Sequence, residues 1–457
     1  MNDFIKNKIN GKRLLILGFG MEGESTYRFL RRYFPDILIT VADKNPEVSG
    51  KIKDLNTELI VGEQYLDNLD DFDIIFKTPG ISLNHLSRTC GIKREKITSQ
   101  TDIFLDYFSS QIIGITGTKG KSTTSSLIFH IIKLFTTNAV LVGNIGVPPF
   151  DHLDEITKNT KIIYELSSHQ LEYITKGPHI GILLNLFQEH LDHYETFETY
   201  QQSKFNITRY QEISDNFIFN ADDILIRKLV SDANLDRNYI GCSLQNIQSK
   251  GCWVDHEKLH FSDGTGKPMI IDLSTGRLLK GDHNVRNIMA AVCACKLTGV
   301  PDDVISEGIR TFKGLEHRME YVGEFNDIHF YNDSIATIPE ATIEAVKTLI
   351  NVDTLILGGF DRGIEYNKLA EFIAGSAIRN ILLLGEAGKR IQDGLKQYNA
   401  SGKTILHIQS LEDAVHIAKE KTAKSKICLL SPAAASYDKF KNFEERGRLY
   451  KKLVRDT

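Results

Sequence analysis

The feature that most constrains this chain is an alternation of short apolar runs with helical segments, repeated in three blocks along 457 residues. Several of the apolar runs stop at a glycine-containing turn, and a helical pattern follows. Short apolar runs separated by helical segments are typical of parallel strands joined by crossover helices. A chain of this length also exceeds one ordinary hydrophobic core. The sequence therefore predicts an α/β fold with several domains.

The three blocks place the natural domain boundaries near residues 109 and 314, which gives expected domains 1–108, 109–313 and 314–457. Each block should form its own largely parallel sheet covered by helices. The expected strands are 13–18, 37–43, 73–80, 111–116, 139–144, 161–168, 180–187, 216–220, 353–359, 380–385 and 426–436, and the clearest expected helices are 24–33, 121–134 and 281–297.

Composition narrows the class of protein. Hydrophobic residues make up 41% and charged residues 25%, as in a soluble globular protein, and the net charge of −4 gives no general attraction to nucleic acid or to an anionic membrane. The first apolar run, Leu14–Leu17, is too short for a signal core or a membrane span. The six cysteines form no CxxC pair, which favours reduced thiols. We therefore expect a cytoplasmic protein without membrane insertion or a nucleic-acid partner.

The most informative motif is the stretch GITGTKGKSTT, residues 114–124, in which an apolar strand enters a glycine-rich turn that opens a helix. Glycines let backbone N–H groups approach phosphate oxygens, and the helix N-terminus favours anions. Lys121 would reach the terminal phosphates and Ser122 would bind magnesium. The fit to GxxxxGK[ST] is imperfect, because Ile115 occupies the first glycine position. The motif predicts a nucleoside triphosphate site without specifying the reaction.

A second glycine turn lies near the N-terminus. Residues 18–23 fit GxGxxG between an expected strand and helix, and Asp43 follows about twenty residues later, as in a dinucleotide-binding fingerprint. By itself this pattern favours a nicotinamide-dependent dehydrogenase. The phosphate loop in the next block argues against that reading, and no catalytic pair for hydride transfer is evident. The same turn could hold a UDP-sugar, or it could be a purely structural turn.

Several polar residues follow the expected strands of the second block. Glu165 ends one strand and His190 follows another, at the edge where open α/β sheets bind ligands. Hard oxygen donors suit magnesium bound to a triphosphate. Further candidates in this region are His169, Glu189, Asp192 and His193. Lys204, considered only as part of a helical pattern, reads as an ordinary surface lysine.

Taken together, the motifs resemble the Mur ligase family, over nearly the whole chain. They are GTKGKSTT (117–124), GNIGVP (143–148), YELSSHQLE (164–172), EHLDHY (189–194), Gly281 with His283, Asn284 and Asn287, GLEHRME (314–320), YNDSIAT (331–337) and SPAAASYDKFKNFEERG (431–447). Two of these motifs, ELSSHQLE and SPAAASYDKFKNFEERG, are most similar to the D-glutamate-adding member.

The resemblance implies three domains: a Rossmann-like N-terminal domain that binds the UDP part of the substrate, a P-loop-type central ATP-binding domain, and a Rossmann-like C-terminal domain that brings the amino acid. It implies ATP and two magnesium ions as cofactors, UDP-N-acetylmuramoyl-L-alanine and glutamate as substrates, a carbamylated lysine at Lys204, and a monomer. It further implies an acyl-phosphate intermediate made from the substrate carboxylate and ATP.

The residue roles implied by the resemblance fall into five groups. Catalytic roles fall on Lys121, Glu165, His190 and Lys204, and the metal ligands are Ser122, Glu165, His190 and Lys204. ATP contacts fall on Gly117, Thr118, Lys119, Gly120, Lys121, Ser122, Thr123, Asn287, Arg318 and Asp333. UDP-substrate contacts fall on Gly18, Met21, Asp43, Pro79, Gly80 and Asn144. Contacts to the incoming amino acid fall on Thr337, Arg362, Ser436 and Phe443.

Two positions depart from the pattern of the glutamate-adding relatives, and both concern the amino-acid site. Ile335 stands where a lysine is usual, and Arg362 is the nearest basic residue to a second usual lysine. A guanidinium can grip a carboxylate through two parallel hydrogen bonds, so Arg362 could compensate. The expected acceptor is D-glutamate, with L-glutamate as the alternative. A UDP-sugar-binding module without catalysis is a further alternative, which the co-occurrence of Lys121, Glu165, His190 and Lys204 disfavours.

Overall fold

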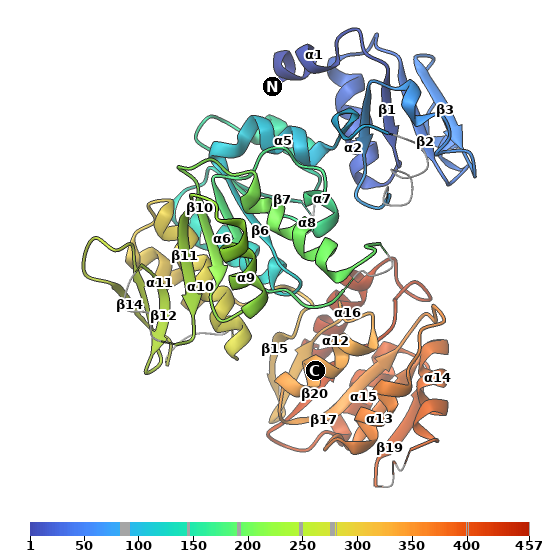
Figure 1. The fold of residues 1–457 in the computed structure, drawn as a ribbon. Helices are drawn as coiled ribbons and strands as arrows, with labels where there is room; N and C mark the ends of the chain where they lie inside the picture. Colours follow the sequence, from blue (N-terminus) through green and yellow to red (C-terminus); the bar gives the residue numbers. More distant parts are fainter. Residues whose placement is uncertain are drawn as a thin grey trace. The chain divides into compact units, whose positions relative to one another are not determined.

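The computed structural model describes residues 1–82, 92–143, 147–189, 193–245, 250–274, 279, 281–398, 400 and 402–456. The chain divides into two compact units, Met1–Phe312 and Lys313–Thr457. The first unit contains two sheets and the second contains one, and all three are rich in parallel strands (Figure 1). The predicted α/β class is confirmed.

The first sheet has five parallel strands in the order β3-β2-β1-β4-β5. Its central strand β1 is buried along its whole length, as expected for a parallel strand covered on both faces. The elements of this part are α1 (Asn2–Ile9), β1 (Leu14–Leu17), α2 (Met21–Tyr33), β2 (Ile39–Asp43), α3 (Val48–Lys51), β3 (Thr57–Val61), β4 (Ile74–Lys77), β5 (Ile97–Thr98) and α5 (Gln100–Phe108).

The second sheet has nine strands in the order β14-β13-β12-β11-β10-β9-β6-β8-β7, parallel from β7 to β12 and antiparallel beyond. Its elements are β6 (Ile112–Thr116), α6 (Lys121–Phe135), β7 (Ala139–Gly143), β8 (Lys161–Glu165), α7 (Ser168–Leu171), β9 (Ile180–Leu183), α8 (Phe197–Arg209), β10 (Asn216–Asn220), α9 (Ile224–Ala233), β11 (Asn238–Ser243), β12 (Gly251–Asp255), β13 (Lys258–Ser262), β14 (Met269–Asp272), α10 (Asp282–Leu297) and α11 (Asp302–Thr311).

Alternate residues of the central strands enter two different cores. Ile113 and Ile115 of β6 pack in a cluster with side chains of α6, α10 and α11. Ile112 of the same strand belongs to a cluster that includes Phe104 of α5 and Phe205 of α8. The sheet is therefore covered by helices on both faces (Figure 1), which leaves the ends of its strands as the accessible edges.

The second unit is built on a six-stranded sheet, β15-β16-β20-β17-β18-β19, in which only β15 and β16 pair antiparallel. Its elements are β15 (Glu320–Phe325), β16 (Ile328–Asn332), α12 (Pro339–Thr348), β17 (Val352–Gly358), α13 (Asn367–Gly375), β18 (Asn380–Leu384), α14 (Gly385–Leu395), β19 (Thr404–Ile408), α15 (Leu411–Lys421), β20 (Lys426–Leu430) and α16 (Phe443–Arg455).

Four predicted strands run three or more residues past the observed ends. The expected strands 73–80, 161–168, 180–187 and 426–436 end at Lys77, Glu165, Leu183 and Leu430. The overrun arises because buried apolar residues continue into the loops: Leu166 and Leu184 follow β8 and β9 and stay buried. A run of apolar residues indicates which residues are buried, and burial can continue beyond the last residue that pairs in the sheet. The helix predicted from residue 24 begins at Met21.

Within the described part of the chain, no helix is both long enough and apolar enough to cross a membrane. Five of the six cysteines are described, and all five are buried free thiols. Cys90 lies outside the described residues.

A phosphate loop with two converging lysines

The loop between β6 and α6 has the backbone that its glycines predict. Gly117 has a φ of +151° and Gly120 a φ of +85°, a region that other residues rarely adopt. A Cβ on Gly120 would lie 2.5 Å from Asn287 Oδ1, so α10 packs directly against the loop. The structure thus brings the predicted ATP contact Asn287 to the predicted phosphate loop.

Asn185, in the loop after β9, anchors the glycine loop from its other side, and it was not identified from the sequence. The Asn185 carbonyl oxygen accepts a hydrogen bond from Thr118 N at 3.0 Å, and Asn185 Oδ1 accepts one from Lys119 N at 2.8 Å. Thr118 Oγ1 also lies 2.9 Å from the hydroxyl of Tyr200 on α8. The signal that could have identified Asn185 is a polar residue two positions after the apolar strand β9.

Two lysine ammonium groups converge on one carbonyl oxygen of this loop. Lys121 Nζ donates to Gly117 O at 3.0 Å and to Thr118 O at 3.1 Å. Lys204 Nζ donates to the same Gly117 O at 2.9 Å. Thr123 follows in the first turn of α6 and is buried. The loop therefore gathers two lysine side chains at the N-terminus of α6, where a polyphosphate would bind.

Lys204 is not the surface lysine that its helical pattern suggested. Only 2% of the residue is exposed, and its Nζ lies 4.9 Å from the centroid of the Tyr200 ring. Burial, and next the ammonium of Lys121, hold the pKa of Lys204 well below its ordinary value, against smaller opposing effects of Glu189 and Glu165. The correction comes from tertiary packing, because α8 packs against β6 and β9 and buries Lys204 beside the loop.

Glu165 is a buried carboxylate beside the phosphate loop. It ends β8 in register with Ile115 of β6 and Gly143 of β7, and it is 1% exposed. Ser125 of α6 donates a long hydrogen bond of 3.5 Å to Glu165 Oε2. A carboxylate and the hydroxyl of Ser122 in the first turn of α6 are donors of the kind that magnesium prefers.

The remaining metal and substrate candidates of this region have mixed outcomes. His190, Asn144 and Asp192 lie outside the described residues. Glu189 forms an ion pair with Lys119. The rings of His169 and His193 meet edge to face at 4.1 Å, and His193 Nε2 lies 3.4 Å from Glu172 Oε2. Among the described residues, no group of three or more His, Cys, Asp or Glu side chains forms a metal-ion cluster.

The carboxyl edge of the first sheet gathers the predicted UDP contacts at the ends of β2, β1 and β4. Gly18 has a φ of +91°, and a Cβ there would lie 2.1 Å from Thr78 Oγ1. Both carboxylate oxygens of Asp43 accept backbone N–H groups, from Phe19 at 2.6 Å and Asn45 at 2.7 Å. Met21 is highly exposed at the start of α2, and Pro79–Gly80 follow β4.

The second unit brings its predicted nucleotide contacts to the ends of β16 and β20. Asp333 is 4% exposed and accepts from Met319 N at 3.1 Å and from Ser431 Oγ at 2.7 Å. Burial raises the pKa of Asp333 to about 7, against those two hydrogen bonds and the nearby charge of Arg318. Arg318 and Asp333 therefore lie close enough for one charge to act on the other.

The predicted amino-acid contacts gather around the same strand ends. Arg362 Nη2 donates to the carbonyl oxygen of Thr337 at 2.8 Å. Ser436 is buried, and the carbonyl oxygen of Phe443 accepts from Ser334 Oγ at 2.8 Å. The buried guanidinium of Arg446 donates hydrogen bonds both to the loop after β16, at Ser334, and to the loop after β20, at Ala434.

Sequence reasoning missed Arg446 as a structural tie. Its guanidinium donates to Ser334 Oγ at 3.0 Å, to the Ser334 carbonyl at 2.8 Å and to the carbonyls of Ala434 and Ala435. Burial lowers the pKa of Arg446 to about 10. The signal in the sequence was an arginine on the inner face of an otherwise amphipathic helix.

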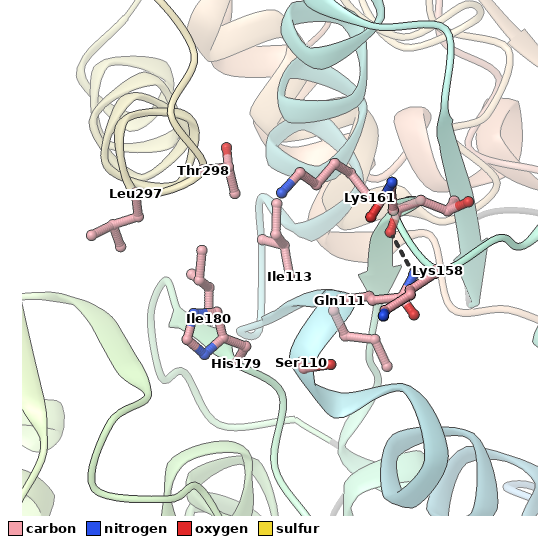
Figure 2. A pocket seen from close by; sticks show the side chains of 12 residues that line it. Ser110, Gln111, Ile113, Lys158, Lys161, His179, Ile180, Leu297 and Thr298 are labelled. Atoms are coloured by element: carbon pink, nitrogen blue, oxygen red, sulfur yellow. Dashed lines mark hydrogen bonds between the residues drawn. The ribbon is translucent and has the colours of Figure 1, made fainter.

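A cavity of about 490 Å³ lies at the opposite edge of the central sheet, where β6, β8 and β9 begin (Figure 2). Its lining includes Lys158, Lys161 and His179, and the His179 ring lies 2.8 Å from Asp215. None of the predicted site residues lines this cavity. The predicted chemistry belongs to the carboxyl edge, where open α/β sheets bind ligands.

We expect Gly120→Ala to weaken ATP binding at least about 10-fold, because the new Cβ would displace Asn287 and strain a backbone with positive φ. Calorimetric titration with ATP measures the change. Gly299→Ala is the matched control: Gly299 has a φ of +80° at the end of the same α10, but its Cβ would meet nothing within 4 Å. Equal ATP affinity in both variants would contradict the role of the Gly120–Asn287 contact.

Comparison with known proteins identifies related domains along most of the chain. The Mur ligase middle domain matches residues 115–295, and the Mur ligase glutamate ligase domain matches residues 317–434. The chain is 36% identical to a UDP-N-acetylmuramoylalanine–D-glutamate ligase of Acetivibrio thermocellus over 99% of this chain and 98% of that protein.

Solved structures share the fold at lower identity. The UDP-N-acetylmuramate-alanine ligase MurC of Thermotoga maritima superposes with a TM-score of 0.55 at 17% identity, over 97% of this chain and 99% of that one. The MurF ligase of Thermotoga maritima, in complex with ADP, has a TM-score of 0.53 at 17% identity, over 98% and 96% of the two chains. With two matched domain models and full-length relatives above 30% identity, this chain belongs to the Mur ligase family.

Proposed function

We propose that this protein joins D-glutamate to UDP-N-acetylmuramoyl-L-alanine at the expense of ATP, in the synthesis of peptidoglycan precursors. The observation that carries the proposal is the convergence of Lys121 and Lys204 on Gly117 O, beside buried Glu165, in a chain of this family. Support for ATP comes from the related MurF ligase, which was solved with ADP. The dehydrogenase alternative finds no support in these relatives.

In this proposal the three sheets correspond to three domains, 1–108, 109–313 and 314–457. The glycine turn of the first sheet binds the UDP part of the substrate through Gly18, Met21, Asp43, Pro79 and Gly80. The loop of the second sheet binds ATP, and the third sheet supplies Thr337, Arg362, Ser436 and Phe443 for the amino acid. We further propose that the enzyme acts as a monomer in the cytoplasm.

The reaction must overcome two difficulties: a carboxylate is a poor electrophile, and it must approach a triphosphate that is also negatively charged. The substrate oxygen therefore attacks the γ-phosphorus of ATP, the bond to ADP breaks, and an acyl phosphate forms. The amine of glutamate then attacks the acyl carbon and phosphate leaves. Lys121 and the loop N–H groups offset the charge of the anions that must meet. Magnesium, held by Ser122, Glu165 and His190, would neutralise further phosphate charge when bound.

Lys204 is suited to carbamylation. Burial, and next the nearby Lys121, lower the pKa of Lys204 well below its ordinary value, and this shift favours the neutral amine, which is the form that attacks carbon dioxide. A bond then forms between Nζ and the carbon, and one proton is released. The carbamate would place a carboxylate beside Gly117, where it would offset the charge of the Lys121 ammonium and would offer a hard oxygen donor to a second magnesium ion.

The decisive experiment offers the protein its substrates in defined combinations. With UDP-N-acetylmuramoyl-L-alanine, ATP and magnesium, we expect phosphate release and a product heavier by one glutamyl residue only when D-glutamate is added. Mass spectrometry and phosphate release measure the outcome. Turnover with L-glutamate alone would show that L-glutamate is the acceptor. This is the alternative that Ile335 and Arg362 raise. Absence of turnover with both isomers would reject the function.

A further inference from the structure

The glycine turn of the first sheet contains a carboxyl group where an anion is expected to bind. Glu22 is the second residue of α2, whose N-terminus follows Gly18 and Gly20. A helix N-terminus attracts negative charge, so a substrate diphosphate and the Glu22 carboxylate would compete for the same positive end. An ionised Glu22 would repel a diphosphate in this turn.

Glu22 is held in this position from a second element. It is partly buried, and its Oε1 accepts a hydrogen bond from Nε2 of Gln170. Gln170 is buried on α7 and completes the capping box that starts this helix at Ser167. The Glu22 side chain is therefore turned toward the central sheet, and its carboxyl group has lost much of its water.

The charged and titratable groups around Glu22 come from three further elements. Lys77 ends β4, is almost fully buried, and acts on Glu22 by its charge. Its Nζ lies 3.3 Å from Glu172 Oε2, a carboxylate that also meets His193. Tyr164 of β8 is the remaining titratable neighbour, and the charge of Glu22 adds to the burial that raises its pKa. Lys77 therefore forms its ion pair with Glu172 rather than with Glu22.

Burial raises the pKa of Glu22 to about 7, although Gln170 and Lys77 favour the ionised form. Burial likewise lowers the pKa of Lys77, against the opposing charges of Glu172 and Glu22. The pKa of Glu172 stays below its ordinary value despite burial, since His193 and Lys77 stabilise its charge. Of the two carboxyl groups, Glu22 is therefore the one that can take up a proton near neutral pH.

We propose that Glu22 is a substrate-positioning carboxyl whose protonation accompanies the binding of the UDP-linked substrate, so that each diphosphate bound in the turn is matched by one proton taken up. The inference rests on the proposed function only in placing a UDP-linked substrate at this turn. Protonated Glu22 keeps its link to Gln170 by one oxygen and presents no negative charge to the diphosphate.

The sign of the pH dependence follows directly. Free Glu22 is mostly protonated below pH 7 and mostly ionised above it, and the diphosphate selects the protonated form. Affinity for the UDP-linked substrate is therefore fully present below pH 7 and falls as the pH rises through 7. If only the protonated form binds, affinity for the UDP-linked substrate falls about 30-fold between pH 6 and pH 8.5, which is the largest effect that Glu22 can have.

The test counts protons directly on the full-length protein. Calorimetric titration with UDP-N-acetylmuramoyl-L-alanine, in buffers of different ionisation enthalpy, gives the number of protons taken up on binding. We expect about 0.8 proton per substrate at pH 7.5 and about 0.1 at pH 6 for the unmodified protein. Glu22→Gln, which keeps the shape of the side chain, should bind with no uptake and with an affinity that changes less than about twofold between pH 6 and 8.5.

The matched control is Glu24→Gln, which removes a carboxylate two positions later on α2. The Glu24 side chain is 45% exposed and pairs with Arg28, so its removal should leave the proton count unchanged. Substrate binding by the unmodified protein without proton uptake, or equal uptake in Glu22→Gln, overturns the inference while the proposed function stands. Failure of every variant and of the unmodified protein to bind the substrate overturns both.

Discussion

Replacing Lys121 by alanine is expected to lower the rate of acyl-phosphate formation at least about 1,000-fold while binding of the UDP-linked substrate survives. The ammonium of Lys121 already lies over the loop, 3.0 Å from Gly117 O and 3.1 Å from Thr118 O. Its charge would act most strongly where the γ-phosphate meets the substrate carboxylate, which is a feature of the transition state. Phosphate release and trapping of the acyl phosphate measure the loss.

Binding and chemistry separate in this experiment because five of the six proposed UDP contacts, Gly18, Met21, Asp43, Pro79 and Gly80, belong to the first sheet and its loops. Calorimetric titration with UDP-N-acetylmuramoyl-L-alanine should give the same affinity as for the unmodified protein. Lys133→Ala is the matched control, since Lys133 is an exposed lysine at the far end of the same helix α6. Turnover by Lys121→Ala at the level of Lys133→Ala would refute the assignment of the phosphate loop.

Replacing Lys204 by alanine is expected to lower turnover at least about 100-fold, and added formate, acetate or propionate should restore part of it. Removal of the side chain leaves space where the proposed carbamate would stand, and a small carboxylate can enter it. The rescue should saturate with acid concentration. Labelling with ¹³C carbon dioxide should give a carbamate signal in the unmodified protein that is missing from Lys204→Ala.

The rescue distinguishes a lost carboxylate from a damaged fold, because a misfolded variant does not respond to acetate. The same acids should leave Lys133→Ala unchanged. Turnover of Lys204→Ala that no acid restores, together with an unmodified protein that shows no carbamate signal, would exclude the carbamate. Lys204 would then act as a second ammonium on Gly117 O.

The phosphate loop was predictable because its chemistry is local. A strand, the glycines at 117 and 120, and a helix that begins at Lys121 are neighbours along the chain, and a short-range pattern is sufficient to specify them. The α/β class was predictable for a similar reason, since the spacing of apolar residues within each segment indicates whether it forms a strand or a helix. Strand ends were less accurate, as the buried loop residues Leu166 and Leu184 show.

What the sequence determined by itself, then, is the class of fold, the glycine loop before α6 and the family, all of which depend on patterns of residues close together in the chain. Only the tertiary structure decided that Lys204 is buried against Gly117 O, that Asn185 anchors the loop, and that Glu22 meets Gln170 across two sheets. Each of these joins residues 60 or more positions apart. Their burial, and with it their pKa, exists only after separate elements have packed together, because desolvation is a property of the folded neighbourhood rather than of a residue type.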